Sequence, residues 1–102
     1  MNNITLTGIM LDELDGMTLD DLAGICSCNT EWIVELVAEG VLEPGGREVA
    51  NWRFTGTCML RTRTALRLYQ DLNINVAGIA LVMDLMEQVE ELQGRLRVLG
   101  PQ

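Results

Sequence analysis

Most of the chain places apolar residues at the three- and four-residue spacing of amphipathic helices. This pattern predicts a first helix from about Leu19 to Ile25 and a second from about Thr30 to Glu39. Thr18 precedes the first helix and Asp21 follows three residues later, which is the spacing of a capping box. The polar run Ser27 to Thr30 leaves room for only a short turn, so the two helices should form a helix-turn-helix.

The segments before and after this pair also have recognisable patterns. Imperfect alternation from Ile4 to Leu14 predicts a short strand or an extended arm. Gly40 should end the second helix, and strand-like alternation from Val49 to Phe54 predicts a small wing hairpin. A third helix is expected from about Thr57 to Leu72, and a last one from about Val76 to Leu99.

The fold class that follows is mainly α: a winged helix-turn-helix with short β elements and a C-terminal coiled-coil helix. We expect residues 1–75 to form the helix-turn-helix domain and residues 76–102 to form a dimerisation segment. Within the last helix, six residues follow the spacing of a coiled-coil seam: Val82, Leu85, Val89, Leu92, Leu96 and Leu99. The adjoining Ile79, Met83 and Met86 should pack on the globular part. The seam covers less than three heptads, so a homodimer should also need contacts from the body.

Charge changes this picture, because the helix-turn-helix half of the chain is acidic. Residues 1–46 contain no lysine or arginine, and they contain nine carboxylates: Asp12, Glu13, Asp15, Asp20, Asp21, Glu31, Glu35, Glu39 and Glu43. The net charge is −8, and the seven basic residues are all arginines after position 46. DNA-binding proteins neutralise phosphates with Lys and Arg, so this half of the chain should repel nucleic acid and attract a basic protein.

Residues for that contact are chosen from the second helix and the start of the first. Glu31, Glu35 and Glu39 recur every four residues on the side opposite Ile33. The candidate partner-binding residues are Asp20, Asp21, Glu31, Val34, Glu35, Ala38 and Glu39. Each group also has an interpretation without partner contact. The glutamates would form an ordinary solvated helix face, and the negative charge of the aspartates would stabilise the N-terminus of the first helix.

The remaining reactive or aromatic side chains are expected to be structural. Arg61, Arg63 and Arg67 should pair with the N-terminal carboxylates, and Trp32, Trp52 and Phe54 should anchor the core. Cys26 and Cys28 should be small buried or turn residues, and three cysteines without histidine do not predict a metal site. With no histidine, no lysine and a single serine, Ser27, the chain is not expected to be an enzyme or to need a cofactor.

Targeting patterns are also missing from the sequence. No apolar run reaches the roughly 18 residues of a transmembrane helix, and the start of the chain lacks the basic and apolar regions of a signal peptide. The odd number of cysteines agrees with a reducing compartment. We therefore expect a cytoplasmic protein that does not contact the membrane.

Three sequence elements together resemble a known family. They are the segment Gly40-Val41-Leu42-Glu43-Pro44, the pair Trp52-x-Phe54, and the stretch from Leu72 to Leu81. Their order and spacing are similar to the MerR-like winged helix-turn-helix and, within it, to the chaperone-modulator family (CbpM-like). The resemblance covers about Ile4 to Leu99, and it offers no interface motif that can be transferred residue by residue.

The resemblance implies an inhibitor of a co-chaperone. Such a protein would bind the J-domain of a DnaJ/CbpA-like co-chaperone, block its stimulation of the DnaK-type chaperone and reduce its association with DNA. The alternative is a MerR-like transcription regulator that would use Arg47, Arg53, Arg61 and Arg63 on DNA. Against this alternative, the second helix has no Arg, Lys, Asn or Gln to contact bases. A third hypothesis is an adaptor for some other basic protein.

Overall fold

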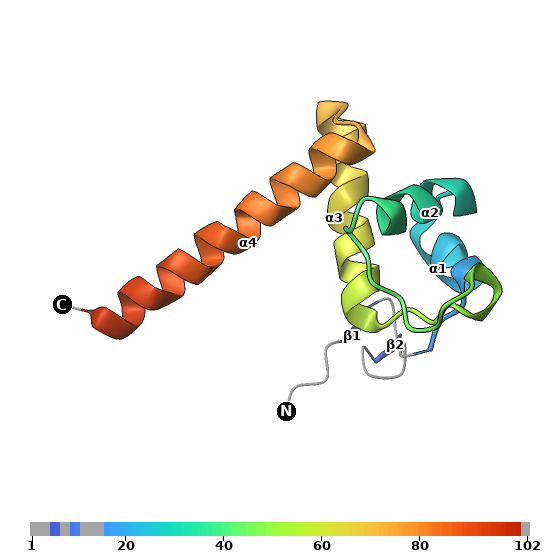
Figure 1. Cartoon of the computed structure of the whole chain (residues 1–102), viewed down its shortest axis with the longest axis horizontal. Coiled ribbons are helices and arrows are strands. Elements are labelled where there is room, and N and C mark those ends of the chain that lie inside the picture. Colours follow the sequence, from blue (N-terminus) through green and yellow to red (C-terminus); the bar gives the residue numbers. More distant parts are fainter. Residues whose placement is uncertain (1–4, 7–8, 11–15, 101–102) are drawn as a thin grey trace.

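The computed structural model describes residues 5–6, 9–10 and 16–100, and this part of the chain is mainly helical, as predicted. Its α-helices are α1 (Leu19–Cys26), α2 (Thr30–Ala38), α3 (Gly56–Leu72) and α4 (Val76–Leu99). Each begins and ends within one residue of the predicted position. In Figure 1, α1, α2 and α3 form a small body, and α4 extends away from it.

A short antiparallel pair lies near the N-terminus. β1 (Thr5–Leu6) pairs with β2 (Ile9–Met10), and Thr5 lies opposite Met10. This confirms the prediction of extended structure for these four residues. The rest of the predicted segment, like Asp12, Glu13 and Asp15, lies outside the described residues.

Side-chain caps fix where α1 and α2 begin. The Thr18 hydroxyl accepts a hydrogen bond from the Asp21 N–H at 3.0 Å, and the Asp21 carboxylate accepts one from the Thr18 N–H at 3.1 Å. The Asn29 side chain accepts a hydrogen bond from the Trp32 N–H at 2.8 Å. These caps satisfy donors that the first turn of a helix leaves unpaired. The predicted capping box of α1 is therefore confirmed, and the Asn29 cap begins α2 a short turn after α1 ends.

The core combines residues from the body with the first turns of α4. Its largest fully buried side chains include Leu22, Ile33, Leu36, Leu42, Phe54, Met59 and Ile79. Ile79 and Met83 are buried, as predicted for the stripe that packs on the body. The same prediction was wrong for Met86, which is 43% exposed, because the side of α4 that still meets the body there carries Glu87.

Beyond Met83, the rest of α4 has no buried side chain. We call residues 84–99 the arm. The helix begins at Asn75, whose side chain accepts a hydrogen bond from the Gly78 N–H at 2.8 Å. Between α3 and α4 the chain turns at Asn73, which adopts the left-handed conformation with φ of 57°. No single helix of the described part is long and apolar enough to cross a membrane. Only the α3–α4 pair, bent by 119°, has the length and composition.

The wing differs from its prediction. Residues Val49–Asn51 form a 3₁₀ helix in place of the expected strand. In and next to the wing, strand-like pairing is confined to two isolated bridges, Gly45 with Arg53 and Met17 with Phe54. The cause is a tight turn at Gly46, where φ is +96° and an added Cβ would lie 2.6 Å from the Asn51 carbonyl oxygen. Glycine allows this close approach of the backbone, so residues 46–52 form a closed loop between the bridged Gly45 and Arg53 in place of a hairpin.

Candidate functional site

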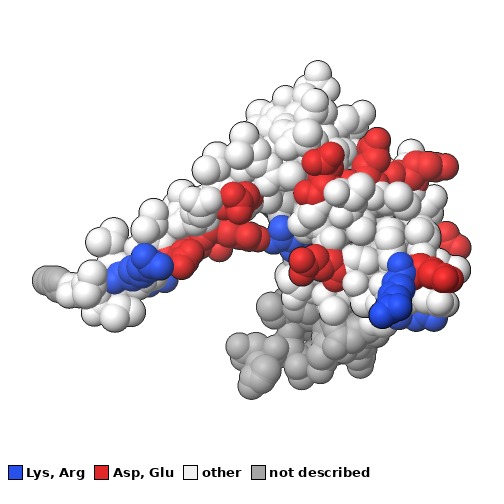
Figure 2. All heavy atoms as spheres, viewed as in Figure 1, with Lys and Arg blue, Asp and Glu red and all other residues white. Residues whose placement is uncertain are grey.

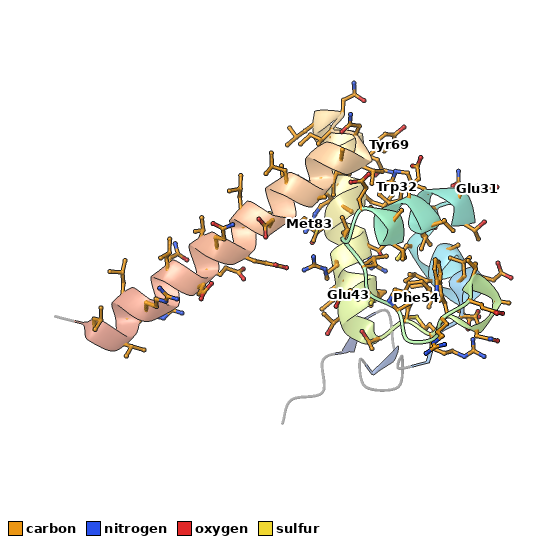
Figure 3. All side chains as sticks on the ribbon, in the orientation of Figure 1. Glu31, Trp32, Glu43, Phe54, Tyr69 and Met83 are labelled. Carbon is orange, nitrogen blue, oxygen red and sulfur yellow. The ribbon has the colours of Figure 1, made fainter. Side chains whose placement is uncertain are left out.

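The acidic face of α2, which we define as Glu31, Glu35 and Glu39, is exposed along the helix. Ile33 and Leu36 on the other side have no exposed surface, so burial of this apolar side fixes the direction in which the carboxylates point. None of the three forms an ion pair within the described residues. Figure 2 shows acidic side chains gathered over α2, and Figure 3 shows Glu31 pointing away from the body.

One end of the acidic face borders a hollow shared with α4. Glu35, Ala38 and Glu39 line a hollow of about 310 Å³ together with Asn75, Val76 and Ala77. Ala38 is exposed, whereas the predicted contact residue Val34 is half-buried. The structure thus brings three predicted residues together with the start of α4. Sequence reasoning predicted that helix start but did not assign it to the site. Only tertiary packing of α2 against α4 could reveal this neighbour.

Asp20 and Asp21 lie apart from that hollow. Both are exposed in the first turn of α1, and neither lines the space between α2 and α4. The Asp21 carboxylate also accepts the capping hydrogen bond from Thr18. Asp21 therefore has a structural role in the helix start, while partner contact by either aspartate stays a prediction.

Comparison with known proteins agrees with this architecture. Residues 17–100 match the family described as MerR HTH family regulatory protein. A chaperone modulatory protein CbpM from Coxiella burnetii is 33% identical over 97% of this chain and 93% of its own length. One from Pseudomonas entomophila is 30% identical, over 86% of this chain and 84% of its own length. The chain belongs to the CbpM family. Membership supports a role as a chaperone modulator within the MerR-like group.

Among the described residues, no arginine of this CbpM-family chain forms the predicted ion pair with an N-terminal carboxylate. Arg61 forms an ion pair with Glu87 on α4 and donates from Nε to the Val41 carbonyl oxygen at 2.7 Å. Arg63 donates from Nε to the Met59 sulfur at 3.3 Å. For Arg61 the prediction was wrong, because its side of α3 faces α4 and the turn after α2, whereas Arg63 lies on the side that faces α1. Arg61, which the alternative hypothesis assigns to DNA, therefore already pairs with Glu87 and the Val41 carbonyl.

The cysteines behave as packing residues, as expected. Cys26 is buried and Cys28 half-buried, and both are free thiols. The pKa of Cys26 is raised to about 11, mainly by burial and also by the neighbouring Cys28, while Arg63 opposes the shift. Burial also raises the pKa of Cys28. A protonated thiol is a poor nucleophile and metal ligand, so neither residue is set up for chemistry at neutral pH.

The aromatic side chains divide into two pairs. Phe54 is fully buried, as predicted, and lies edge-on to Trp52 with ring centroids 6.0 Å apart. Trp32 is only partly buried and lies 5.8 Å from Tyr69, which is 47% exposed. Sequence reasoning assigned no role to Tyr69. Its contact with Trp32 joins α3 to α2 (Figure 3) and could not be inferred from spacing along the chain.

All residues of the predicted seam except Val82 lie on the arm, and their side chains are largely exposed to solvent. Leu85, Val89 and Leu92 are about half exposed, at 49%, 52% and 56%, and Leu96 and Leu99 reach 68% and 83%. Val82, nearest the body, is half-buried. A continuous apolar stripe of this size on a helix that projects from the body is typical of a surface that another surface covers.

Proposed function

We propose that this chain inhibits a DnaJ/CbpA-like co-chaperone by binding its J-domain in competition with the DnaK-type chaperone. The observation that carries the proposal is the acidic face of α2, held outward by a fully buried apolar side. In a helix-turn-helix this second helix is the one that usually enters the major groove. Here its exposed charges fit a basic polypeptide and oppose phosphate.

Charge and apolar contact would have separate roles in this complex. The uncompensated carboxylates of the acidic face would speed approach and set the register of the partner. Ala38, Val76 and Ala77 in the adjoining hollow would supply apolar contact beside those charges. Val34 and the α1 aspartates Asp20 and Asp21 would contribute at the edges. Affinity should therefore decline with added salt without vanishing, because the apolar part is not screened.

The direct test is reversal of charge on the acidic face. The double variant Glu31→Lys, Glu35→Lys should bind an isolated J-domain at least about tenfold more weakly by calorimetry, with unchanged far-UV circular dichroism. The matched control is Glu43→Lys, Glu48→Lys, which alters the net charge equally at exposed positions in the loop after α2. Equal losses for both double variants would show general steering and would reject the acidic face as the contact surface.

We further propose that the seam Val82, Leu85, Val89, Leu92, Leu96 and Leu99 pairs two copies of the chain. Along α4 the acidic residues Asp84, Glu87, Glu90 and Glu91 precede Arg95 and Arg97. An antiparallel pair would place the basic end of one arm near the acidic part of the other, whereas a parallel pair would place like charges together. The homodimer would therefore have antiparallel arms.

The MerR-like match makes DNA binding the alternative to test. Arg47 and Arg53 are exposed near the wing and remain available for phosphate, whereas Arg61 is held by Glu87 and Val41. Fluorescence anisotropy with duplex DNA at about 150 mM salt should show no specific binding. Tight binding there would favour the regulator, and capture of a basic protein without a J-domain would favour the adaptor.

A further inference from the structure

A second hollow lies beside the acidic face, between the α1–α2 turn and α3. It measures about 220 Å³, and its walls include Cys28, Asn29, Trp32, Leu66, Tyr69 and Gln70. None of the residues that line it carries a charge at neutral pH. It is therefore a mixed site, with two aromatic rings and Leu66 beside the polar side chains of Asn29 and Gln70, and it adjoins an acidic helix.

The aromatic pair in this hollow differs from the pair in the core. Phe54 is fully buried beside Trp52, so that contact is explained by core packing. Tyr69 is 47% exposed although its ring lies 5.8 Å from Trp32, with the two planes inclined by 51°. An exposed tyrosine next to a partly exposed tryptophan is the combination most often found where a protein anchors its partner. The two rings contact each other and leave part of the Tyr69 ring open, so that a flat group could stack on it.

Charge around the hollow selects the kind of group. Glu31 directly precedes Trp32 on α2, and Glu35 follows three residues later; both are exposed. The faces of aromatic rings attract cations, and nearby carboxylates strengthen that attraction. The nearest arginines on α3, Arg63 and Arg67, line a neighbouring hollow that shares Leu66 with this one. They border the site without entering it.

We propose that the Trp32–Tyr69 hollow receives an arginine side chain from the basic partner that the acidic face attracts. This inference rests on the proposed function, because it takes the same polypeptide as the source of the arginine. A planar guanidinium can stack on the open face of the Tyr69 ring, while its aliphatic stem contacts Leu66 and its N–H groups reach the Gln70 side chain. A lysine ammonium lacks the flat shape and stacks less well.

A single tryptophan can report on the hollow. The variant Trp52→Phe leaves Trp32 as the only tryptophan, and its emission should change on titration with an isolated J-domain. The midpoint should match the affinity found by calorimetry. In this background Tyr69→Ala should weaken binding roughly fivefold to thirtyfold, the range expected for a partly desolvated cation–π contact. Tyr69→Phe keeps the ring and should stay within about twofold.

The control is Val49→Ala, which removes a side chain of nearly the same exposure, 48%, from the 3₁₀ helix. It should leave the affinity unchanged. Should Trp52→Phe fold poorly, ¹⁹F NMR of the wild-type chain labelled with 5-fluorotryptophan gives the same readout. The resonance that responds to partner is assigned to Trp32 if Trp32→Phe removes it.

The outcomes separate this inference from the proposed function. If J-domain binding is retained, Trp32 is silent and Tyr69→Ala binds as tightly as wild type, the hollow is rejected and the proposed function stands. If no J-domain binds, the proposed function fails, and a hexa-arginine peptide becomes the probe. A Trp32 response that Tyr69→Ala weakens and Tyr69→Phe keeps would then support an arginine site. A response that ignores both substitutions would overturn it.

Discussion

The body and the arm use the same apolar residue types in opposite environments. Leu22, Ile33 and Phe54 in the body have no exposed surface, whereas Leu92 and Leu96 on the arm are 56% and 68% exposed. Burial of apolar surface is the main force that stabilises a fold. The body obtains it from its own chain, but the arm can obtain it only from another molecule. Substitution of a core side chain should therefore lower the stability of the fold, whereas substitution of a seam side chain should weaken association between copies.

The largest effect is expected in the body, from Phe54→Ala. This substitution empties a fully buried position and should lower the free energy of unfolding by about 3–5 kcal/mol in urea titrations. Such a loss is a large part of the stability of a small domain. The exposed Val49→Ala should stay within about 0.5 kcal/mol. Similar losses for both would mean that Phe54 does not anchor the core.

A seam substitution should leave the fold intact and act on association. Leu92→Glu should raise the dissociation constant of the homodimer at least about tenfold in sedimentation equilibrium, because it places a charge inside an apolar interface. Its helical circular dichroism should be retained. Val98→Glu, at an 85% exposed position outside the seam, is the matched control. If both variants dimerise like wild type, some surface other than the seam joins the copies.

The boundary between body and arm can be tested at the Arg61–Glu87 ion pair. The pair is partly exposed, so Glu87→Gln should cost less than about 1 kcal/mol in stability. Its clearer result should be wider motion of the arm relative to the body, measured by ¹⁵N relaxation. Glu91→Gln breaks the Arg95–Glu91 pair, which lies entirely within the arm, and should not alter that motion. Equal relaxation in the two variants would show that the pair does not orient the arm.

At neutral pH the smallest effect should come from ionisation of the Cys26 thiol of the body, which acts only in alkaline solution. Its pKa is raised to about 11 from 9.0, so the folded protein holds this proton more tightly than the unfolded chain. The free energy of unfolding gained in this way is complete below about pH 9 and should decline as the pH rises to about 11. Cys26→Ala should reduce this decline. A slope identical in both proteins would mean that other groups cause it.

The same division explains what could be predicted from the sequence. Helix positions in both regions follow from local signals, namely apolar spacing and the caps at Thr18 and Asn29. The wing was predicted less well because Trp52 and Phe54 alternate like a strand, while the tight turn at Gly46 decides the local structure. Local pattern is thus sufficient where one helix face is buried, and it fails where a turn constrains the chain.

The candidate site was predicted only in part, for a related reason. Glu35, Ala38 and Glu39 could be chosen from helix spacing, since they share one side of α2. Their neighbours Val76 and Ala77 could not, because the contact joins helices that are distant in sequence. Arg61 shows the same limit: spacing shows that it lies on α3, but only the packed structure shows that it faces Glu87. Pairings across the fold need coordinates.

The two bonds of Arg61 also connect the proposed partner-binding region to the arm. One side chain holds the carbonyl of Val41, just after α2, and the carboxylate of Glu87, one turn beyond the last buried residue of α4. If a partner bound to α2 displaces the turn at Gly40, one of two things must follow. Either Arg61 loses its bond to Val41 or to Glu87, or the arm moves together with the turn. In a homodimer joined through the arms, that movement would change the distance between the two bodies. Binding of a partner to one copy would then affect binding to the other.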